Sequence, residues 1–474
     1  MGSSPEAKGA PAFSEALDLK TRLSYGVGEL AGALPTSANA FLLLFFLTNV
    51  AGLAPSLAGA VILVSKVWDA FSDPLIGWLS DRTRSPLGRR YPWMLAGAIP
   101  LGLLTAFQWL LPPTDQQWLL FAFYTTAGVL AFTAFTAVQL PFSALAAELT
   151  QGYDARISLI SFKSGFSICG SIFTLLIARL IFAQITDPGA QYIVLGGING
   201  SLVVLAIGIC VLGTLPRYRL VRSSHPEIGV ATSNSLLKQI RAAMQSRAFL
   251  WVIGLYLCSW TGVQVTAVVL PYFVVDWMGL SEQHFFQMAL VVQGTAVCTM
   301  YGWNVMARHT GKRSIYFMGI PVTLVGLAGL FFIQPGQVGW MYALGCMAGV
   351  GVSTVYLVPW SMLPDVVDLD ELTTGKRREG IFYGFVVFLQ KIGIALAVFI
   401  TGRVLDWAGF MPSVAGAAAP VQPDSALWAI RLIMGPLPVV TLLLGLLFAY
   451  WYPISREVHA EILMKLKARH GADV

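Results

Sequence analysis

Long hydrophobic stretches, separated by short polar connections, follow one another along the whole chain. Each is about twenty residues long or longer, the length that a helix needs to cross the hydrocarbon core of a bilayer. None shows the alternation over about ten residues that is typical of a membrane β-barrel. The pattern predicts an all-α membrane protein with twelve transmembrane helices, over residues 24–50, 55–80, 92–111, 117–149, 158–184, 191–214, 248–275, 284–307, 313–333, 337–363, 380–408 and 425–452.

The composition agrees with a chain whose solvent is lipid. Of the 474 residues, 56% are hydrophobic and only 11% are charged, whereas soluble domains carry about 25% charged residues. The formal net charge is +6, but the basic residues lie in short clusters between apolar runs. Membrane orientation explains that placement better than nucleic-acid binding does. The five cysteines lie inside apolar runs without paired spacing, so we expect neither a disulfide framework nor a zinc site.

Lysine and arginine occur in every second connection between the hydrophobic stretches. The intervening connections, 51–54, 112–116, 185–190, 276–283, 334–336 and 409–424, contain none. Basic connections stay in the cytoplasm, so we expect both termini there and the protein in the inner (plasma) membrane of a bacterium. The long polar loop 215–247 divides the chain into a tail 1–23, a six-helix half 24–214, this loop, a second six-helix half 248–452 and a tail 453–474. Short basic turns at 81–90 and 307–313 hold matching positions in the two halves, which favours duplicated halves.

Ionisable residues away from the ends of membrane helices are costly and mark candidate sites. Lys66, Asp69 and Asp73 are spaced i, i+3, i+7, so they share one helical face. Two carboxylates one turn apart repel unless one takes a proton or a cation lies between them. This pattern indicates a proton carrier or a hard-cation site, with Ser72 and a hydroxyl from a facing helix as further oxygen ligands. The alternative is that Lys66 simply neutralises Asp69.

Three other intramembrane charges stay open in their roles. Lys391, near the middle of its stretch, needs an anion, either a carboxylate across the bundle or a group of the substrate. Lys163 lies closer to the cytoplasmic end of its stretch. Its side chain either extends to the membrane–water interface or has a functional role, and both explanations fit equally well. Glu29, in a glycine-rich segment, is a substrate group, a proton group or the partner of a lysine. The chain has no nucleophile elbow, zinc-protease or phosphate-loop motif, so we expect neither an enzyme, nor a cofactor, nor ATP-driven transport.

Several motifs taken together resemble one family. Residues 66–93 read KVWDAFSDPLIGWLSDRTRSPLGRRYPW, which is similar to the signature of the glycoside–pentoside–hexuronide:cation symporters, a branch of the major facilitator superfamily. The resemblance extends to YGVG at 25–28, QLPFSAL at 139–145, PWSMLPDVVD at 359–368, TGKRREG at 374–380 and YPI at 452–454. It implies a major facilitator fold of two six-helix halves and cation-coupled transport by alternating access. A non-transporting sensor or channel is a third, distant alternative.

The resemblance also implies site residues. Asp69, Asp73, Ser72 and Thr136 match the cation site of the melibiose permease branch, where the ion is sodium or a proton, and Lys391 matches the lysine of the eleventh helix. The family's galactoside-binding carboxylates and tryptophan are replaced here by Ala33, Gln139 and Ser143, so galactosides are doubtful. The substrate-binding residues that we expect are Glu29, Gln139, Ser143, Lys163, Trp260, Gln264, Tyr356, Trp360 and Lys391.

The expected substrate is a sugar, a glycoside or a related small solute. The alternative is a lysophospholipid or another amphiphile, because PWSMLPD is shared with animal sodium-dependent lysophosphatidylcholine symporters. Membrane lipid is the other expected partner, and the protein is expected to act as a monomer without nucleic acid. The basic turns are expected to latch the outward-facing state through acidic partners. The residues concerned are Asp81, Arg82, Arg89, Arg90, Glu148, Arg308, Lys312, Arg313, Asp365 and Asp368.

Overall fold

The computed structural model describes residues 17–150, 153–224, 244, 246–375, 379–416 and 420–472. Within these ranges the chain forms helices, apart from one isolated β-bridge between Ala51 and Val414. In the same part of the chain, nine helical segments are long and apolar enough to cross a membrane. The prediction of an all-α, multi-pass membrane protein is therefore confirmed.

The first group of helices spans Leu19 to Ser224. One membrane segment, Leu19–Asn49, is built from four consecutive pieces: α1 (Leu19–Gly28), α2 (Leu30–Ala38), the π-helix η1 (Asn39–Leu43) and α3 (Leu44–Asn49). It is followed by α4 (Pro55–Arg82), α5 (Tyr91–Phe107), α6 (Gln117–Leu149), α7 (Tyr153–Gln184) and α8 (Pro188–Ser224). We call α1–α8 the first helix group.

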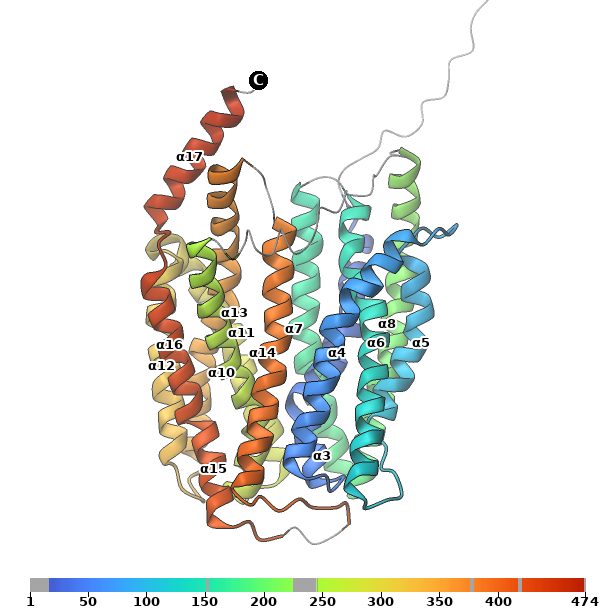
Figure 1. Ribbon diagram of the computed structural model, residues 1–474, viewed down its shortest axis with the longest axis vertical. Coiled ribbons are helices and arrows are strands. Elements are labelled where there is room, and N and C mark those ends of the chain that lie inside the picture. The colour runs from blue at the N-terminus through green and yellow to red at the C-terminus, as the bar shows by residue number, and fades with distance from the viewer. Residues whose placement is uncertain are drawn as a thin grey trace, which may run out of the picture.

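The second helix group begins with α10 (Arg247–Tyr272), which continues as the π-helix η2 (Phe273–Trp277). It goes on with α11 (Glu282–Thr310), α12 (Lys312–Phe332), α13 (Val338–Thr374), α14 (Glu379–Trp407), α15 (Asp424–Met434) and α16 (Pro436–Trp451). A last helix, α17 (Arg456–Ala472), follows the group. In Figure 1 the second helix group lies on the left and α3–α8 lie on the right, with α17 projecting at the top.

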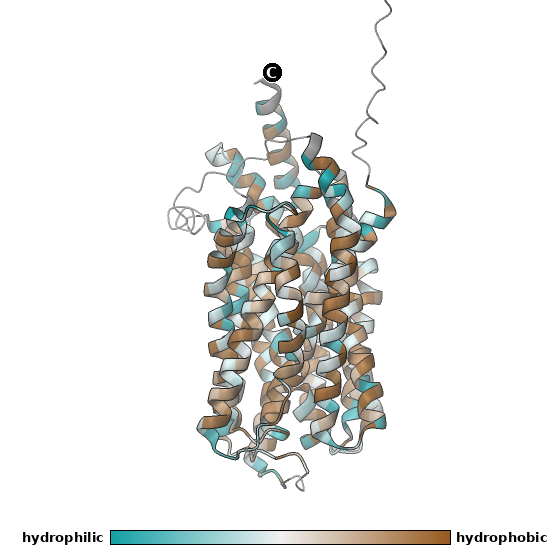
Figure 2. Cartoon of the chain, turned by 90° about the vertical axis from the view of Figure 1, so that its right-hand side faces the viewer, coloured by the Kyte–Doolittle hydropathy of each residue, from teal (hydrophilic) through white to brown (hydrophobic). Residues whose placement is uncertain are grey.

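Two helices extend beyond the limits that the hydropathy predicts. The α8 helix continues from the predicted end at residue 214 to Ser224, and α13 continues from residue 363 to Thr374. Gly375 ends α13 with φ +71°, a left-handed conformation that glycine adopts without strain. Residues 1–16 of the expected tail and 225–243 of the expected middle loop lie outside the described part of the chain. Figure 2 shows hydrophobic residues filling the middle of the bundle, with more hydrophilic residues toward its two ends.

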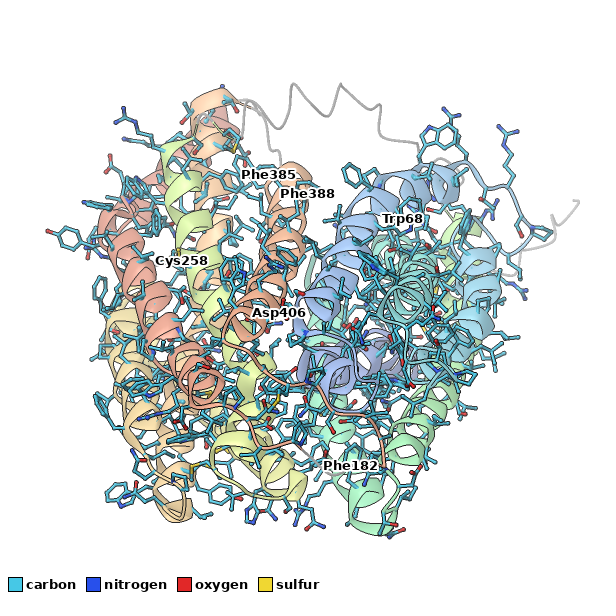
Figure 3. All side chains as sticks on the ribbon, turned by 60° about the horizontal axis from the view of Figure 1, so that its bottom comes forward. Trp68, Phe182, Cys258, Phe385, Phe388 and Asp406 are labelled. Atoms are coloured by element: carbon cyan, nitrogen blue, oxygen red, sulfur yellow. The ribbon has the colours of Figure 1, made fainter. Side chains whose placement is uncertain are left out.

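The two helix groups meet closely at the end that carries the connections without lysine or arginine. There the Thr48 hydroxyl lies 2.7 Å from the Tyr272 hydroxyl, and the backbone N–H of Ser413 donates to the Thr48 carbonyl at 2.9 Å. Helix α4 crosses α14 where glycines allow it, because a Cβ on Gly402 would lie 2.3 Å from the Pro55 carbonyl oxygen. In Figure 3, which brings this end toward the viewer, Asp406 of α14 lies at the boundary between the two groups.

Candidate functional site

The paired carboxylates of α4 face α6 of the first helix group and α14 of the second. Asp69 is fully buried, at 0% exposed. The Thr136 hydroxyl of α6 lies 2.9 Å from Asp69 Oδ1 and 3.2 Å from Asp73 Oδ1, so it is placed to donate to either carboxylate. The Ser72 hydroxyl lies 3.4 Å from the Thr136 hydroxyl and donates to the Asp69 carbonyl at 3.0 Å. The structure thus brings the four predicted cation ligands together.

Both aspartates are paired with a lysine from the other helix group. The Lys391 ammonium of α14 lies 2.7 Å from Asp73 Oδ2 and 3.0 Å from Asp69 Oδ2. The sequence predicts that Lys391 pairs either with a carboxylate across the bundle or with a group of the substrate, and the structure shows the carboxylates. Lys66 does not make the contact with Asp69 that its i, i+3 spacing allows. Its ammonium lies 4.1 Å from the centroid of the Phe132 ring instead, as a cation–π contact.

A second charged network joins Glu29 to α6 and α7. The Gln139 side-chain amide donates to Glu29 Oε2 at 3.0 Å, and the Lys163 ammonium lies 3.6 Å from the same oxygen. Lys163 also donates to the Ser143 hydroxyl at 2.9 Å. Gly32 permits this arrangement, because a Cβ there would lie 2.7 Å from the Gln139 amide nitrogen. Glu29 is 8% exposed, and of the roles left open for it the structure shows the partner of a lysine.

A cavity of about 390 Å³ lies between the two helix groups, beside the Glu29 network. It is lined from both groups, and its walls are largely apolar. Among the expected substrate residues, the wall includes Glu29, Gln139, Trp260, Gln264 and Tyr356. Ser143 and Lys163 do not line the cavity; Lys163 contacts Glu29 and Ser143 instead. Lys391 binds the aspartates, and its neighbour Gln390 lines the wall.

Trp360 is the expected substrate residue that the structure places away from this wall. It is 36% exposed and stacks on Tyr383 with ring centroids 6.1 Å apart. The Trp260 and Tyr356 rings of the wall lie 5.3 Å apart and meet edge to face. The aromatic group expected from the sequence is therefore divided between the cavity wall and a contact of Trp360 with Tyr256 of α10 and Tyr383 of α14.

Neutral polar residues of the cavity wall are missing from the predicted set. The Gln293 amide of α11 donates to the Ser171 hydroxyl of α7 at 3.0 Å, and both residues line the cavity. Ser167 and Gln390 line it as well. The predicted set takes its neutral polar residues from the matched family positions and from the seventh and tenth predicted helices, and it does not include these four. A search for glutamines and serines inside hydrophobic stretches finds them, because such side chains need a partner or a polar ligand in lipid.

The expected latch residues form two separate clusters, each inside one helix group. In the first, Glu148 Oε1 lies 2.6 Å from Arg89 Nε and 3.3 Å from Arg90 Nε, while Arg90 also pairs with Asp81 at 2.5 Å. Partial burial acts to lower the pKa of the Arg89 guanidinium, but the hydrogen bond and charge of Glu148 outweigh this, so its pKa lies above the usual value. The Arg82 guanidinium lies over the Trp78 ring, 4.0 Å from its centroid.

The second cluster ties α12 and α17 to α13. The Lys312 ammonium lies 2.7 Å from Asp365 Oδ1. His459 of α17, which the sequence prediction missed, lies 3.4 Å from Asp365 and 3.2 Å from Asp368. Arg313 packs over Tyr450, 5.4 Å from its ring centroid. The side chain of Arg308 lies outside the described residues. Each cluster holds neighbouring helices of one group together, at the end of the protein opposite to the contact between Thr48 and Tyr272.

Sequence comparison places the chain among transporters. The family model described as MFS/sugar transport protein matches residues 24–456. An uncharacterized symporter of Synechocystis sp. is 42% identical, covering 96% of this chain and 98% of that protein. A protein of Escherichia coli assigned by name to the glycoside/cation symporters is 27% identical over 90% of this chain and 89% of its own length. The sodium-dependent lysophosphatidylcholine symporter 1-A of Danio rerio is 25% identical over 93% of this chain and 87% of its own.

Comparison with solved structures adds the fold. The nucleoside transporter NupG superposes with a TM-score of 0.62, covering 92% of this chain and 100% of the other at 13% identity. The inward open xylose transporter XylE of E. coli superposes with a TM-score of 0.57, covering 92% and 96% at 13% identity. At such low identity the likeness establishes the fold alone.

Proposed function

The chain belongs to the MFS/sugar transport protein family, and from this premise we propose that it is a sodium- or proton-coupled symporter rather than an enzyme. Its twelve spans form two six-helix halves, 24–214 and 248–452, joined by a cytoplasmic loop 215–247. The tails 1–23 and 453–474 are also cytoplasmic, in the inner membrane of a bacterium. The closure between the groups near Thr48 and Tyr272 supports a state that is open toward the cytoplasm.

The observation that carries the proposal is the sharing of Lys391 between Asp69 and Asp73. A coupling cation that binds both carboxylates takes the place of the ammonium, with the Thr136 and Ser72 hydroxyls as further oxygen ligands. Because Lys391 belongs to α14 and the aspartates to α4, this exchange replaces a contact between the two halves by one inside the first half. The cation thereby changes the free energy of one half relative to the other, as coupling requires.

The substrate is proposed to occupy the cavity of about 390 Å³ between the halves. Gln139, Gln264, Gln293 and the Glu29–Lys163 pair offer the hydrogen-bonding groups that a sugar, a glycoside or a related small solute needs. A lysophospholipid or another amphiphile is the second candidate. The apolar wall favours it, since Phe135, Met288, Val292 and Met300 present no hydrogen-bonding side chain to a sugar.

The two cytoplasmic clusters are proposed to act as latches that hold helix ends together during the conformational change. One contains Asp81, Arg82, Arg89 and Arg90 with Glu148; the other contains Arg308, Lys312, Arg313, Asp365 and Asp368. Asp81→Ala is expected to alter the transport rate much more than folding, because Asp81 is nearly half exposed. An unchanged rate contradicts the latch. No cofactor is required, and the monomer in lipid is the proposed functional unit.

Uptake into proteoliposomes tests the proposal. Labelled sugars and labelled lysophosphatidylcholine are supplied with and without an inward sodium or proton gradient. Wild-type protein is expected to accumulate one of these classes only with a gradient. Asp69→Asn is expected to abolish the cation dependence, and Asp406→Asn, an acid of α14 that lies 4.0 Å from Arg403, is the matched control that retains it. Uptake by Asp69→Asn that still responds to the gradient shows that the cation site is wrong.

A further inference from the structure

Lys66 is a positive charge inside the membrane that, among the residues the structure describes, forms no ion pair with a carboxylate. Its ammonium rests on the Phe132 ring at 4.1 Å, while Lys391 occupies the nearby aspartates. A cation–π contact compensates only part of the cost of removing an ammonium from water. The site is therefore incomplete as it stands, and an anion completes it.

A cavity of about 70 Å³ adjoins this ammonium. A single buried water needs roughly 10–15 Å³ of such space, so the cavity has room for a small polar group. Its wall includes Lys66, Phe132, Asn39 at the start of η1 and Gln264 of α10. Thr36, Ala40, Gln264 and Ile394 line both this cavity and the main one. The small cavity is therefore a side chamber of the proposed substrate cavity.

Two amides in the side chamber lack partners. The side-chain oxygen of Asn39 is buried without a hydrogen bond, and the Gln264 side chain has no hydrogen-bond partner in the described part of the chain. An amide can turn over to present its N–H₂ group, because its oxygen and nitrogen have nearly the same shape. The buried Asn39 oxygen calls for an explanation, because buried polar groups without partners are rare in native structures. With the Lys66 ammonium, these amides provide the donors that an anion requires.

The charges around the cation site balance only while the coupling ion is absent. With all four side chains ionised, the two positive charges of Lys66 and Lys391 balance the two negative charges of Asp69 and Asp73. A cation bound between the aspartates leaves this cluster with one unbalanced positive charge. A monoanion in the side chamber restores neutrality. Each ion therefore lowers the free energy of binding of the other, which is a coupling free energy in the strict sense.

We propose that the side chamber at Lys66 binds the anionic group of the transported substrate, a carboxylate, sulfonate or phosphate ester, and that this anion and the coupling cation bind cooperatively. The body of the substrate lies in the main cavity. This inference rests on the proposed function, since it names the substrate class of the same transporter. The shared chemistry is one negative charge, carried either by a small solute or by the head of an amphiphile.

The test uses purified full-length protein in proteoliposomes with two matched pairs of probes. One pair is glucuronate with methyl glucoside, and the other is lysophosphatidylglycerol, whose phosphate diester carries one negative charge, with the uncharged monoacylglycerol. The wild type is expected to bind the anionic member of one pair at least tenfold more tightly than its partner, and tenfold more tightly in sodium than in choline. The pair that responds identifies the source of the anion. Equal binding of the members in both pairs, or no binding of either anion, overturns the proposal.

Substitutions at Lys66 give the second measurement. Lys66→Met is expected to lose the preference for the anionic probe by tenfold or more while sodium still binds without substrate, and Lys66→Arg is expected to restore the preference. If Lys66→Met keeps the preference, or if Lys66→Arg loses it while sodium still binds, the side chamber is not the anion site. If the wild type transports a neutral probe in a cation-dependent manner and Lys66→Met transports it equally well, this inference is wrong but the proposed function stands. Transport by the wild type that ignores every cation gradient defeats the proposed function itself.

Discussion

Replacing Lys391 by methionine is expected to tighten the binding of the coupling cation. The Lys391 ammonium lies 2.7 Å from Asp73 Oδ2 and 3.0 Å from Asp69 Oδ2, so it occupies the space that a shared cation needs. Methionine keeps an unbranched apolar stem and removes the charge. The variant therefore separates competition at the carboxylates from packing along α14.

The geometry sets the size of the effect. Thr136 Oγ1 lies within 3.2 Å of one oxygen of each carboxylate, so these two oxygens are at most about 6 Å apart. At an effective dielectric constant of about 20, two unit charges at ~6 Å repel by about 3 kcal/mol. In the variant only a cation or a proton relieves this repulsion. Because 1.4 kcal/mol is tenfold, we expect the sodium dissociation constant to fall at least about tenfold, and roughly a hundredfold if a repulsion of about 3 kcal/mol is fully relieved.

Sodium titration of the purified protein measures this change. Calorimetry measures binding, and the tryptophan emission of the protein, to which Trp68 directly before Asp69 contributes, gives an independent value. The titration is made at alkaline pH with choline as the balancing ion, because a proton competes for the second carboxylate of the variant. Lys391→Arg keeps the positive charge and is expected to bind sodium no more tightly than the wild type. Sodium affinity that is unchanged or weaker in Lys391→Met refutes the competition.

Three further changes test other parts of the structure. Glu148→Gln removes the charge against Arg89, 2.6 Å away, and is expected to lower the free energy of unfolding by about 3 kcal/mol in denaturant titrations; equal stability contradicts a structural latch. Gly402→Ala places a Cβ 2.3 Å from the Pro55 carbonyl oxygen and is expected to lower the free energy of unfolding by about 1–3 kcal/mol. It is also expected to make the end of the protein near Thr48 and Tyr272 accessible to an impermeant thiol reagent, and an unchanged labelling pattern contradicts this. Thr136→Val is expected to weaken sodium binding about tenfold, with Thr136→Ser as the control that retains it.

Hydropathy predicts nine of the twelve expected segments as helices long and apolar enough to cross a membrane in the described part of the chain, because the bilayer fixes their length. The predicted stretch 117–149 coincides with α6 (Gln117–Leu149), and 425–452 closely matches α15 and α16 together. Hydropathy marks the limits of the bilayer, however, and a helix ends where its backbone is capped. The α13 helix therefore runs past its apolar part to Gly375, and α8 runs to Ser224. The π-helix at Asn39–Leu43 carries no pattern in the sequence that distinguishes it from an α-helix.

The spacing of residues along a helix predicts which charged side chains of the candidate cation site share a face, but it does not determine which residues they pair with. The i, i+3, i+7 spacing of Lys66, Asp69 and Asp73 places them on one face of α4, but it equally allows Lys66 and Lys391 as the counter-charge. The structure chooses Lys391 because α14 crosses α4, and that crossing is a tertiary contact that helical periodicity does not encode. The pairing of Glu29 with Lys163 depends in the same way on the packing of α1 against α7.

The departure from the local pairing rule is itself informative. Natural sequences satisfy local preferences almost everywhere, and conflicts with them gather at functional sites. A Lys66–Asp69 pair within α4 would keep the charges of the first helix group balanced in every conformation, because both partners move together. Pairing across the groups makes the balance depend on how α14 sits against α4, and it leaves the Lys66 ammonium available to an anion. This change of partner is what links the proposed cation site to the proposed movement of the two helix groups and to the proposed charge of the substrate.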